Sequence, residues 1–124
     1  MKLLIKLFFS IIILASFSSA KADTIKWLHL FSDDDLNMPG MLQAVKEFEE
    51  KTGHTVEMQY LENESFKAKL PTMLQSNDRP DIFYSWSGGV MYDQAEAGFL
   101  RDISDLVPDS YLDTVSAAAA DAFT

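Results

Sequence analysis

The sequence predicts an α/β fold built on a parallel β-sheet. Three short stretches rich in strand-forming residues occur at 24–30, 54–61 and 81–85, and amphipathic helical patterns separate them. Strands that alternate with helices form a parallel sheet with right-handed crossovers. The favoured strand orders place the first strand in the middle, between the second and the third.

The first strand and the first helix are expected within residues 24–53. The strand alternates in polarity and places on one face Ile25, Trp27 and His29. After a polar loop, Pro39 suits the first turn of a helix, where a missing N–H is tolerated. Apolar residues then recur at helical spacing until Gly53, which ends the helix because glycine readily takes a positive φ.

The second strand, residues 54–61, is followed by a second helix. Its alternation turns inward Val56, Met58 and Tyr60. Asn63 is a suitable N-cap for the helix. The buried stripe of that helix is expected to consist of Phe66, Leu70, Met73 and Leu74. Pro71 lies inside this stripe and removes one backbone hydrogen bond, so we expect a kink or a restart there.

The third strand, residues 81–85, contains an apolar run without alternation, so both of its faces are expected to be covered. A helix over 89–97 follows and ends at Gly98. Beyond a short extended or turn segment, Pro108 opens a last helix that continues into an alanine run. The chain reaches Thr124 in a helical composition without a cap, which is typical of a truncated sequence.

The first 22 residues have the pattern of a cleaved signal peptide. Lys2 and Lys6 precede an apolar segment that is shorter than the roughly 20 residues needed to span a bilayer. Small residues before Asp23 suit a signal peptidase, so we expect cleavage after Ala22. The alternative is a retained membrane anchor. With cleavage, residues 23–124 form one small periplasmic domain with no direct membrane insertion.

Composition narrows the classes of partner. Removing residues 1–22 takes away three lysines and no acid, which changes the net charge from −9 to −12 over 102 residues. Nucleic acid and anionic lipid are not expected as partners, because both are bound through basic patches. The chain has no cysteine, so it has neither disulfides nor thiolate metal ligands. We expect a monomer.

Two loops predict a ligand site, because ligands bind outside the carboxyl ends of the strands where the strand order reverses. The candidate contacts are Ser32, Asp33 and Asp34 after the first strand, and Ser85, Trp86 and Ser87 after the third. An indole ring covers the C–H face of a sugar, and a carboxylate accepts from neighbouring hydroxyls. The alternatives are a core role for Trp86 and, for the aspartates, a solvated loop in which one caps the next helix.

Other chemistries have less support. The run from Asp33 to Asn37 begins like a calcium loop, but Met38 and Ala44 stand where that loop requires glycine and glutamate. Ser87 does not lie in a G-x-S-x-G elbow, and no nucleophile–base pair is visible. The two histidines share no helix face, as a zinc pair would. We therefore expect no catalytic residue, no metal and no cofactor.

Four stretches in order carry a resemblance to a known family. They read IKWLHLFSDDD, MLQAVKEFEEKTGHTVEMQYL, KLPTMLQSNDRPDIFYSWSGG and AEAGFLRDISDLV. They resemble the extracellular solute-binding proteins of ABC-type sugar importers, the group that includes maltodextrin and multiple-sugar binders. The resemblance covers nearly all of residues 24–124. It implies a periplasmic-binding-protein fold of two α/β lobes that close on the ligand, of which this chain holds only the first lobe, incomplete.

The resemblance also implies a function. The six candidate residues match first-lobe sugar contacts, and the family captures a carbohydrate in the periplasm and delivers it to a membrane permease without catalysing a reaction. We expect this chain to be a fragment that lacks the second lobe. Two alternatives stay open. One is a secreted α/β hydrolase fragment, and the other is a receptor for a polyamine or cation, which the aspartate run and Trp86 would suit.

Overall fold

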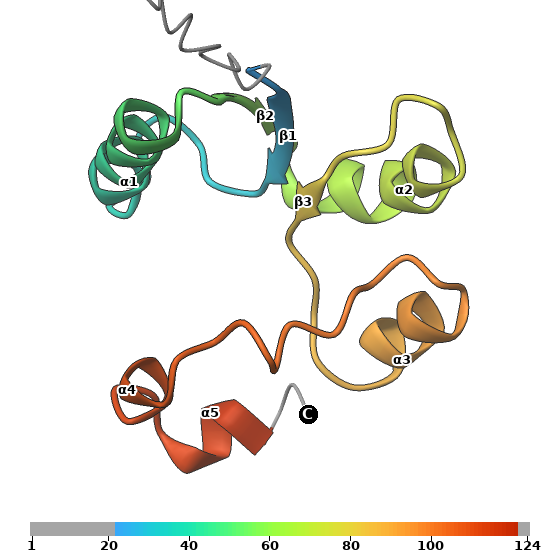
Figure 1. Cartoon of the computed structure of the whole chain (residues 1–124). Helices are drawn as coiled ribbons and strands as arrows, with labels where there is room; N and C mark the ends of the chain where they lie inside the picture. Colours follow the sequence, from blue (N-terminus) through green and yellow to red (C-terminus); the bar gives the residue numbers. More distant parts are fainter. Residues whose placement is uncertain (1–21, 122–124) are drawn as a thin grey trace, which may run out of the picture.

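The computed structural model describes residues 22–121 as strands and helices in alternation (Figure 1). The elements are β1 (Thr24–His29), α1 (Met38–Thr52), β2 (Thr55–Tyr60), α2 (Asn63–Leu74), β3 (Ile82–Phe83), α3 (Gly89–Glu96), α4 (Asp109–Leu112) and α5 (Ala117–Asp121). The predicted signal peptide, apart from Ala22, lies outside the described residues. Within residues 22–121, no helix has both the length and the apolar character that crossing a bilayer requires.

The three strands form a parallel sheet in the order β2-β1-β3. This confirms the predicted fold class and the central place of the first strand. β1 and β2 pair along their whole length, from Thr24 opposite Thr55 to His29 opposite Tyr60. In Figure 1, α1 and α2 flank the sheet on opposite sides, and α3 to α5 lie beyond the carboxyl ends of the strands.

β3 is shorter and more exposed than the sequence predicted. It spans two residues rather than 81–85, and it pairs with β1 at one edge of the sheet. Phe83 packs against the core, but Ile82 is 50% exposed. The prediction of two covered faces is therefore wrong, because an apolar run does not distinguish a central strand from an edge strand with one packed face.

The core lies between the sheet and α2. Leu28 of β1 meets the stripe of α2, where Phe66 is fully buried and Leu70 and Leu74 are nearly so. The predicted stripe is confirmed for these three residues of α2, and Met73 packs against them while partly exposed. The helix continues through Pro71 as one element, so of the predicted kink or restart the restart does not occur.

The opposite face of the sheet is packed more loosely. Ile25, Trp27 and Phe48 help to line a hollow of about 190 Å³ between the sheet and α1. The end of α1 follows the prediction. Gly53 has a φ of 75°, and its N–H donates to the carbonyl of Glu49 at 2.8 Å.

Two helix boundaries differ from the prediction. The N-cap of α2 is Glu62 rather than Asn63, because the Glu62 carboxylate accepts from the N–H groups of Glu64 at 3.0 Å and Ser65 at 3.2 Å. The expected last helix is divided into α4 and α5. Hydroxyls in the connection bond to backbone groups and so compete with a continuous helix; Thr114 Oγ1, for example, donates to the Tyr111 carbonyl at 2.6 Å.

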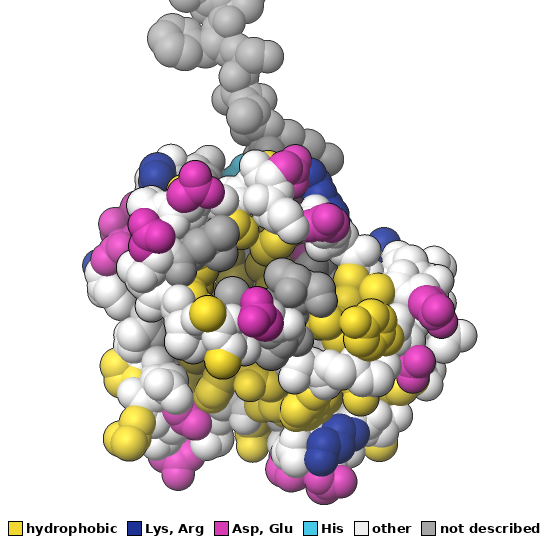
Figure 2. Space-filling model, turned by 90° about the horizontal axis from the view of Figure 1, so that it is seen from below, with side chains coloured by type: hydrophobic (Ala, Val, Ile, Leu, Met, Phe, Trp, Pro, Cys, Tyr) yellow, Lys and Arg dark blue, Asp and Glu magenta, His cyan; other side chains and the backbone are white. Residues whose placement is uncertain are grey.

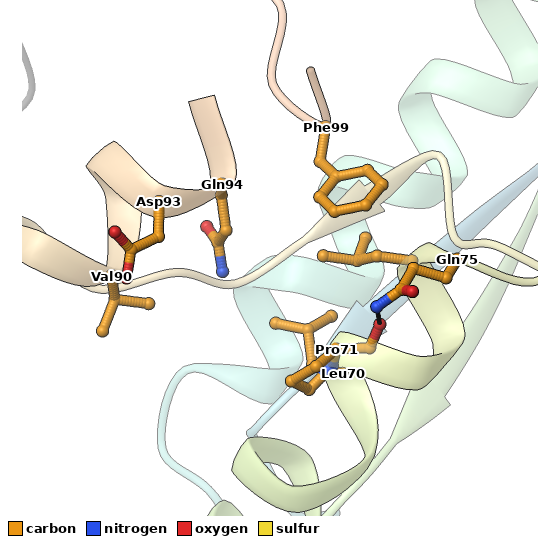
Figure 3. A pocket seen from close by; sticks show the side chains of 8 residues that line it. Leu70, Pro71, Gln75, Val90, Asp93, Gln94 and Phe99 are labelled. Atoms are coloured by element: carbon orange, nitrogen blue, oxygen red, sulfur yellow. Dashed lines mark hydrogen bonds between the residues drawn. The ribbon is translucent and has the colours of Figure 1, made fainter. Parts of the chain in front are cut away.

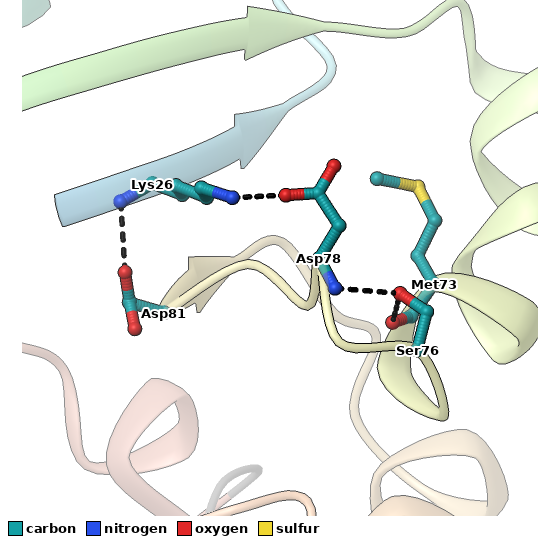
Figure 4. Close-up of polar contacts among 5 residues, drawn as sticks. All are labelled: Lys26, Met73, Ser76, Asp78 and Asp81. Carbon is teal, nitrogen blue, oxygen red and sulfur yellow. Dashed lines mark hydrogen bonds and ion pairs between the residues drawn. The ribbon is translucent and has the colours of Figure 1, made fainter. Parts of the chain in front are cut away.

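The loop between α2 and β3 is tied to β1 (Figure 4). The backbone N–H of Lys26 donates to Asp81 Oδ2 at 2.9 Å, and the Lys26 ammonium pairs with the Asp78 carboxylate. The hydrogen bond to Asp78 raises the pKa of Lys26. On the other side of this loop, the N–H of Asp78 donates to Ser76 Oγ, which itself donates to the carbonyl of Met73. These contacts fix where the chain enters β3 and hence where residues 84–87 leave it.

Candidate ligand-binding site

A row of ring side chains crosses the carboxyl ends of the strands. In order, the aromatic row consists of Tyr60, His29, Phe31, Tyr84, Trp86 and Phe66. Neighbouring ring centroids lie 5.7 to 6.3 Å apart. The contact between Phe31 and Tyr84, edge to face at 5.9 Å, joins the segment after β1 to the segment after β3. The parallel sheet therefore brings the two predicted loops to one edge, as their places after β1 and β3 require.

The loop after β1 presents carboxylates to solvent. Asp33 and Asp34 are both exposed. Ser32 Oγ donates to Asp34 Oδ1 at 2.5 Å, and this hydrogen bond lowers the pKa of Asp34. Asp35 has a different task, since its Oδ1 accepts from the N–H of Asn37 at 2.8 Å and shapes the turn into α1. Asp33 and Asp34 are left with oxygens that a ligand can reach.

In the segment after β3, one serine is hydrogen-bonded within the protein and the other is exposed to solvent. Ser85 Oγ donates to Gln94 Oε1 at 2.6 Å, and Gln94 of α3 is only 8% exposed. Ser85 therefore ties α3 to the end of β3 and has no free proton to donate to a ligand. Ser87 is exposed, directly before Gly88, whose φ of 81° turns the chain into α3.

Trp86 is half-buried and has two different environments. Its ring packs edge to face against Phe66 of the core, with centroids 5.7 Å apart. Lys67 Nζ lies 5.7 Å from the indole centroid, within the range of a cation–π contact. Trp86 and Lys67 also line a hollow of about 410 Å³ with residues of α2 and α3. Trp86 is thus anchored in the core at one edge and borders open space at another.

The rings bring the two predicted groups of residues together, and the polar side chains do not. Among residues 22–121, no hydrogen bond joins residues 32–34 to residues 85–87, and the hollow beside Trp86 is lined from α2 and α3. Sequence reasoning missed Tyr84 as a site residue, although it connects Phe31 with Trp86. The available signal was the spacing of Tyr84 and Trp86, which places two rings on one side of an extended chain.

His29 occupies a buried place in the aromatic row. It is 3% exposed, and its Nδ1 has no hydrogen-bond partner among the described residues. Burial lowers the pKa of His29, and the backbone of Phe31 and the charge of Asp33 oppose this effect in part. In the described part of the chain, no three histidine, aspartate or glutamate side chains converge as a metal site would require. The edge of the sheet therefore offers rings and exposed carboxylates.

Comparison with known proteins adds two findings. The sequence model of the family described as bacterial extracellular solute-binding protein matches residues 35–124. A solved structure from work on xylan utilization by the thermophilic bacterium Caldanaerobius polysaccharolyticus superposes with a TM-score of 0.64 at 21% identity. The match covers 76% of the present chain and 24% of that structure, so the chain spans about a quarter of the length of its structural relative. The search among curated proteins gave no match.

Proposed function

The chain belongs to the bacterial extracellular solute-binding proteins, and on this premise we propose that it forms part of a receptor that captures a carbohydrate for an ABC importer. The observation that carries the proposal is the aromatic row beside the exposed carboxylates of Asp33 and Asp34. Ring faces suit the C–H surface of a sugar, and ionised carboxylates accept from its hydroxyls. The relative from the xylan study is consistent with this ligand class.

Within this proposal the candidate residues have distinct tasks. Trp86 offers its ring to the sugar, Asp33 and Asp34 accept hydroxyl protons, and Ser32 and Ser87 add hydroxyls at the two ends of the site. Ser85 acts as a positioning residue, since its proton is already donated to Gln94. The lowered pKa of Asp34 keeps its carboxylate ionised and able to accept hydrogen bonds.

We infer that residues 1–22 are a signal peptide and that residues 23–124 begin the first lobe of a two-lobe periplasmic protein. Figure 2 shows hydrophobic side chains exposed in several patches on the side where α3 to α5 lie. Good ligand sites bury 70–90% or more of a small molecule, which an open edge of one lobe does not achieve. A second lobe would close over the sugar, and the closed form would dock on a membrane permease. The role involves no catalysed reaction.

One contact argues against the polyamine or cation alternative. Lys67 Nζ already lies 5.7 Å from the centre of the Trp86 ring, so a cationic ligand stacked on this ring would meet a like charge. A neutral sugar would meet no such repulsion. The hydrolase alternative has less support, because no hydrogen bond described within residues 22–121 joins a serine hydroxyl to a histidine. Ser32 donates to Asp34, but the lowered pKa of this carboxyl makes it a weak base.

Calorimetry on the product of the complete gene tests the proposal. A panel of neutral oligosaccharides should include at least one that binds with micromolar affinity or better, and spermidine should not compete with it. Binding of spermidine with no sugar bound would replace the proposal by the cation receptor. Turnover of a chromogenic glycoside or ester would instead support the hydrolase.

A further inference from the structure

A groove runs between α2 and α3, next to the proposed sugar site. The hollow of about 410 Å³ beside Trp86 and Lys67 continues into a second one of about 250 Å³. Figure 3 shows the second hollow, which reaches Phe99. The two hollows share four lining residues, Leu70, Pro71, Val90 and Gln94. We refer to the space lined by these four residues, Trp86 and Phe99 as the α2–α3 groove.

The Gln94 side chain is largely buried but has an unused hydrogen-bond donor that faces the groove. The oxygen of the Gln94 amide accepts from Ser85, and its nitrogen has no partner among the described residues. Figure 3 shows this nitrogen directed toward the side of the groove formed by Leu70 and Pro71. Because this nitrogen faces the open groove, water can solvate it in the free protein, and a ligand that carries an acceptor there would replace that water.

Charges of both signs stand at the rim of the groove, and its lining is apolar. Lys67 is paired with Glu64 at 2.9 Å on the surface of α2. Asp93 lines the groove from α3 and is exposed. Between these charges, the residues that define the groove are apolar apart from Gln94. The groove therefore suits a neutral group that is apolar apart from a single hydrogen-bond acceptor.

We propose that the α2–α3 groove binds the acyl group of an ester-substituted saccharide whose sugar ring lies against Trp86. The ester carbonyl accepts a hydrogen bond from Gln94 Nε2, and the acyl carbons contact Leu70 and Val90. An acyl group matches the lining because it combines one carbonyl acceptor with an apolar remainder. This inference rests on the proposed sugar site, since Trp86 borders both.

The test compares two forms of the same ligand pool on the product of the complete gene. Partially O-acetylated xylo- and gluco-oligosaccharides are measured by calorimetry beside the same pools after mild alkaline treatment, which removes esters and keeps glycosidic bonds. We expect the acetylated pool to bind at least about fivefold more tightly. Equal affinity for the two pools would overturn the inference and leave sugar binding in place. Absence of binding to either pool and to the neutral sugar panel would overturn both.

Two variants locate the effect. Gln94→Glu keeps an oxygen for Ser85 and replaces the N–H donors, so the preference for the acetylated pool should disappear. Val90→Phe narrows the groove from a position that is about half exposed, and it should reduce the preference even where Gln94→Glu impairs folding. Tyr92→Phe on the same helix, at an exposed position that does not line the groove, is the matched control and should retain it. A preference that survives both groove variants would place the acyl group elsewhere and overturn the inference.

Discussion

The two faces of the central sheet are covered by helices that contribute very differently to the core. α2 has 12 residues and buries Phe66, Leu70 and Leu74 almost completely against Leu28. α1 is longer, with 15 residues, yet Phe48 on its inner side stays 38% exposed beside a hollow of about 190 Å³. The difference shows that the length of an amphipathic helix does not determine how much apolar surface it removes from water. Because the hydrophobic contribution to stability scales with that buried surface, the shorter helix α2 should contribute more.

Matched phenylalanine truncations on the two helices should have the largest effect. Phe66→Ala should lower the free energy of unfolding by about 3–5 kcal/mol, because it opens a cavity in a fully buried place. Phe48→Ala should cost less than half as much, since part of its ring is already in water. Urea denaturation of each variant measures both values. Equal losses would mean that α1 is packed as tightly as α2.

The two tryptophans separate binding from stability. Trp86→Ala should weaken binding of the preferred sugar by about tenfold or more, which is about 1.4 kcal/mol, and should also destabilise the fold, though less than Phe66→Ala. Trp27, on the α1 face, is the matched control. Trp27→Ala should lower the melting temperature and leave sugar affinity within about twofold. Loss of affinity in both variants would indicate that unfolding, rather than a lost ring contact, explains the effect of Trp86.

Two glycines of the α1 region test its backbone separately from its packing. Gly53→Ala should destabilise the protein by about 1 kcal/mol, because the residue at this position has a φ of 75°. Gly40→Ala should stabilise it by about 0.4–1 kcal/mol, since Gly40 lies in the first turns of α1 and an added methyl group meets nothing within 4 Å. Thermal unfolding of both variants shows whether each substitution raises or lowers the free energy of unfolding. A stabilising Gly53→Ala would contradict the left-handed end of α1.

The sequence was sufficient for features that depend on periodicity and local backbone chemistry. The parallel sheet with the first strand in the middle, the buried stripe of α2 and the end of α1 at Gly53 all follow from such patterns. The length and burial of β3 were overestimated because apolar composition does not indicate which strands and helices lie next to a strand. Glu62 was missed as the N-cap of α2 because capping preferences favour asparagine, which follows it in the chain.

The candidate site depends more on tertiary contacts than the fold does, so less of it could be predicted from the sequence. The order of strands was enough to bring the ends of β1 and β3 together. The hydrogen bond from Ser85 to Gln94 joins residues nine positions apart in the chain, and no local pattern identifies such a pair. The same is true of Lys67, which reaches the Trp86 ring from a different helix. These two contacts decide that Ser85 positions α3 and that Trp86 borders the α2–α3 groove.

The smallest effect should come from His29, which lies on the α1 face of the sheet, between Tyr60 and Phe31 in the aromatic row. Burial lowers the pKa of His29 below its usual 6.5, so the unfolded chain takes up a proton at a higher pH than the folded chain. The free energy of unfolding should therefore fall as the pH decreases from about 6.5 toward 5, a range above that in which Asp34 is protonated. His29→Phe should flatten this slope. An unchanged slope in His29→Phe would show that groups other than His29 control the pH dependence of stability in this range.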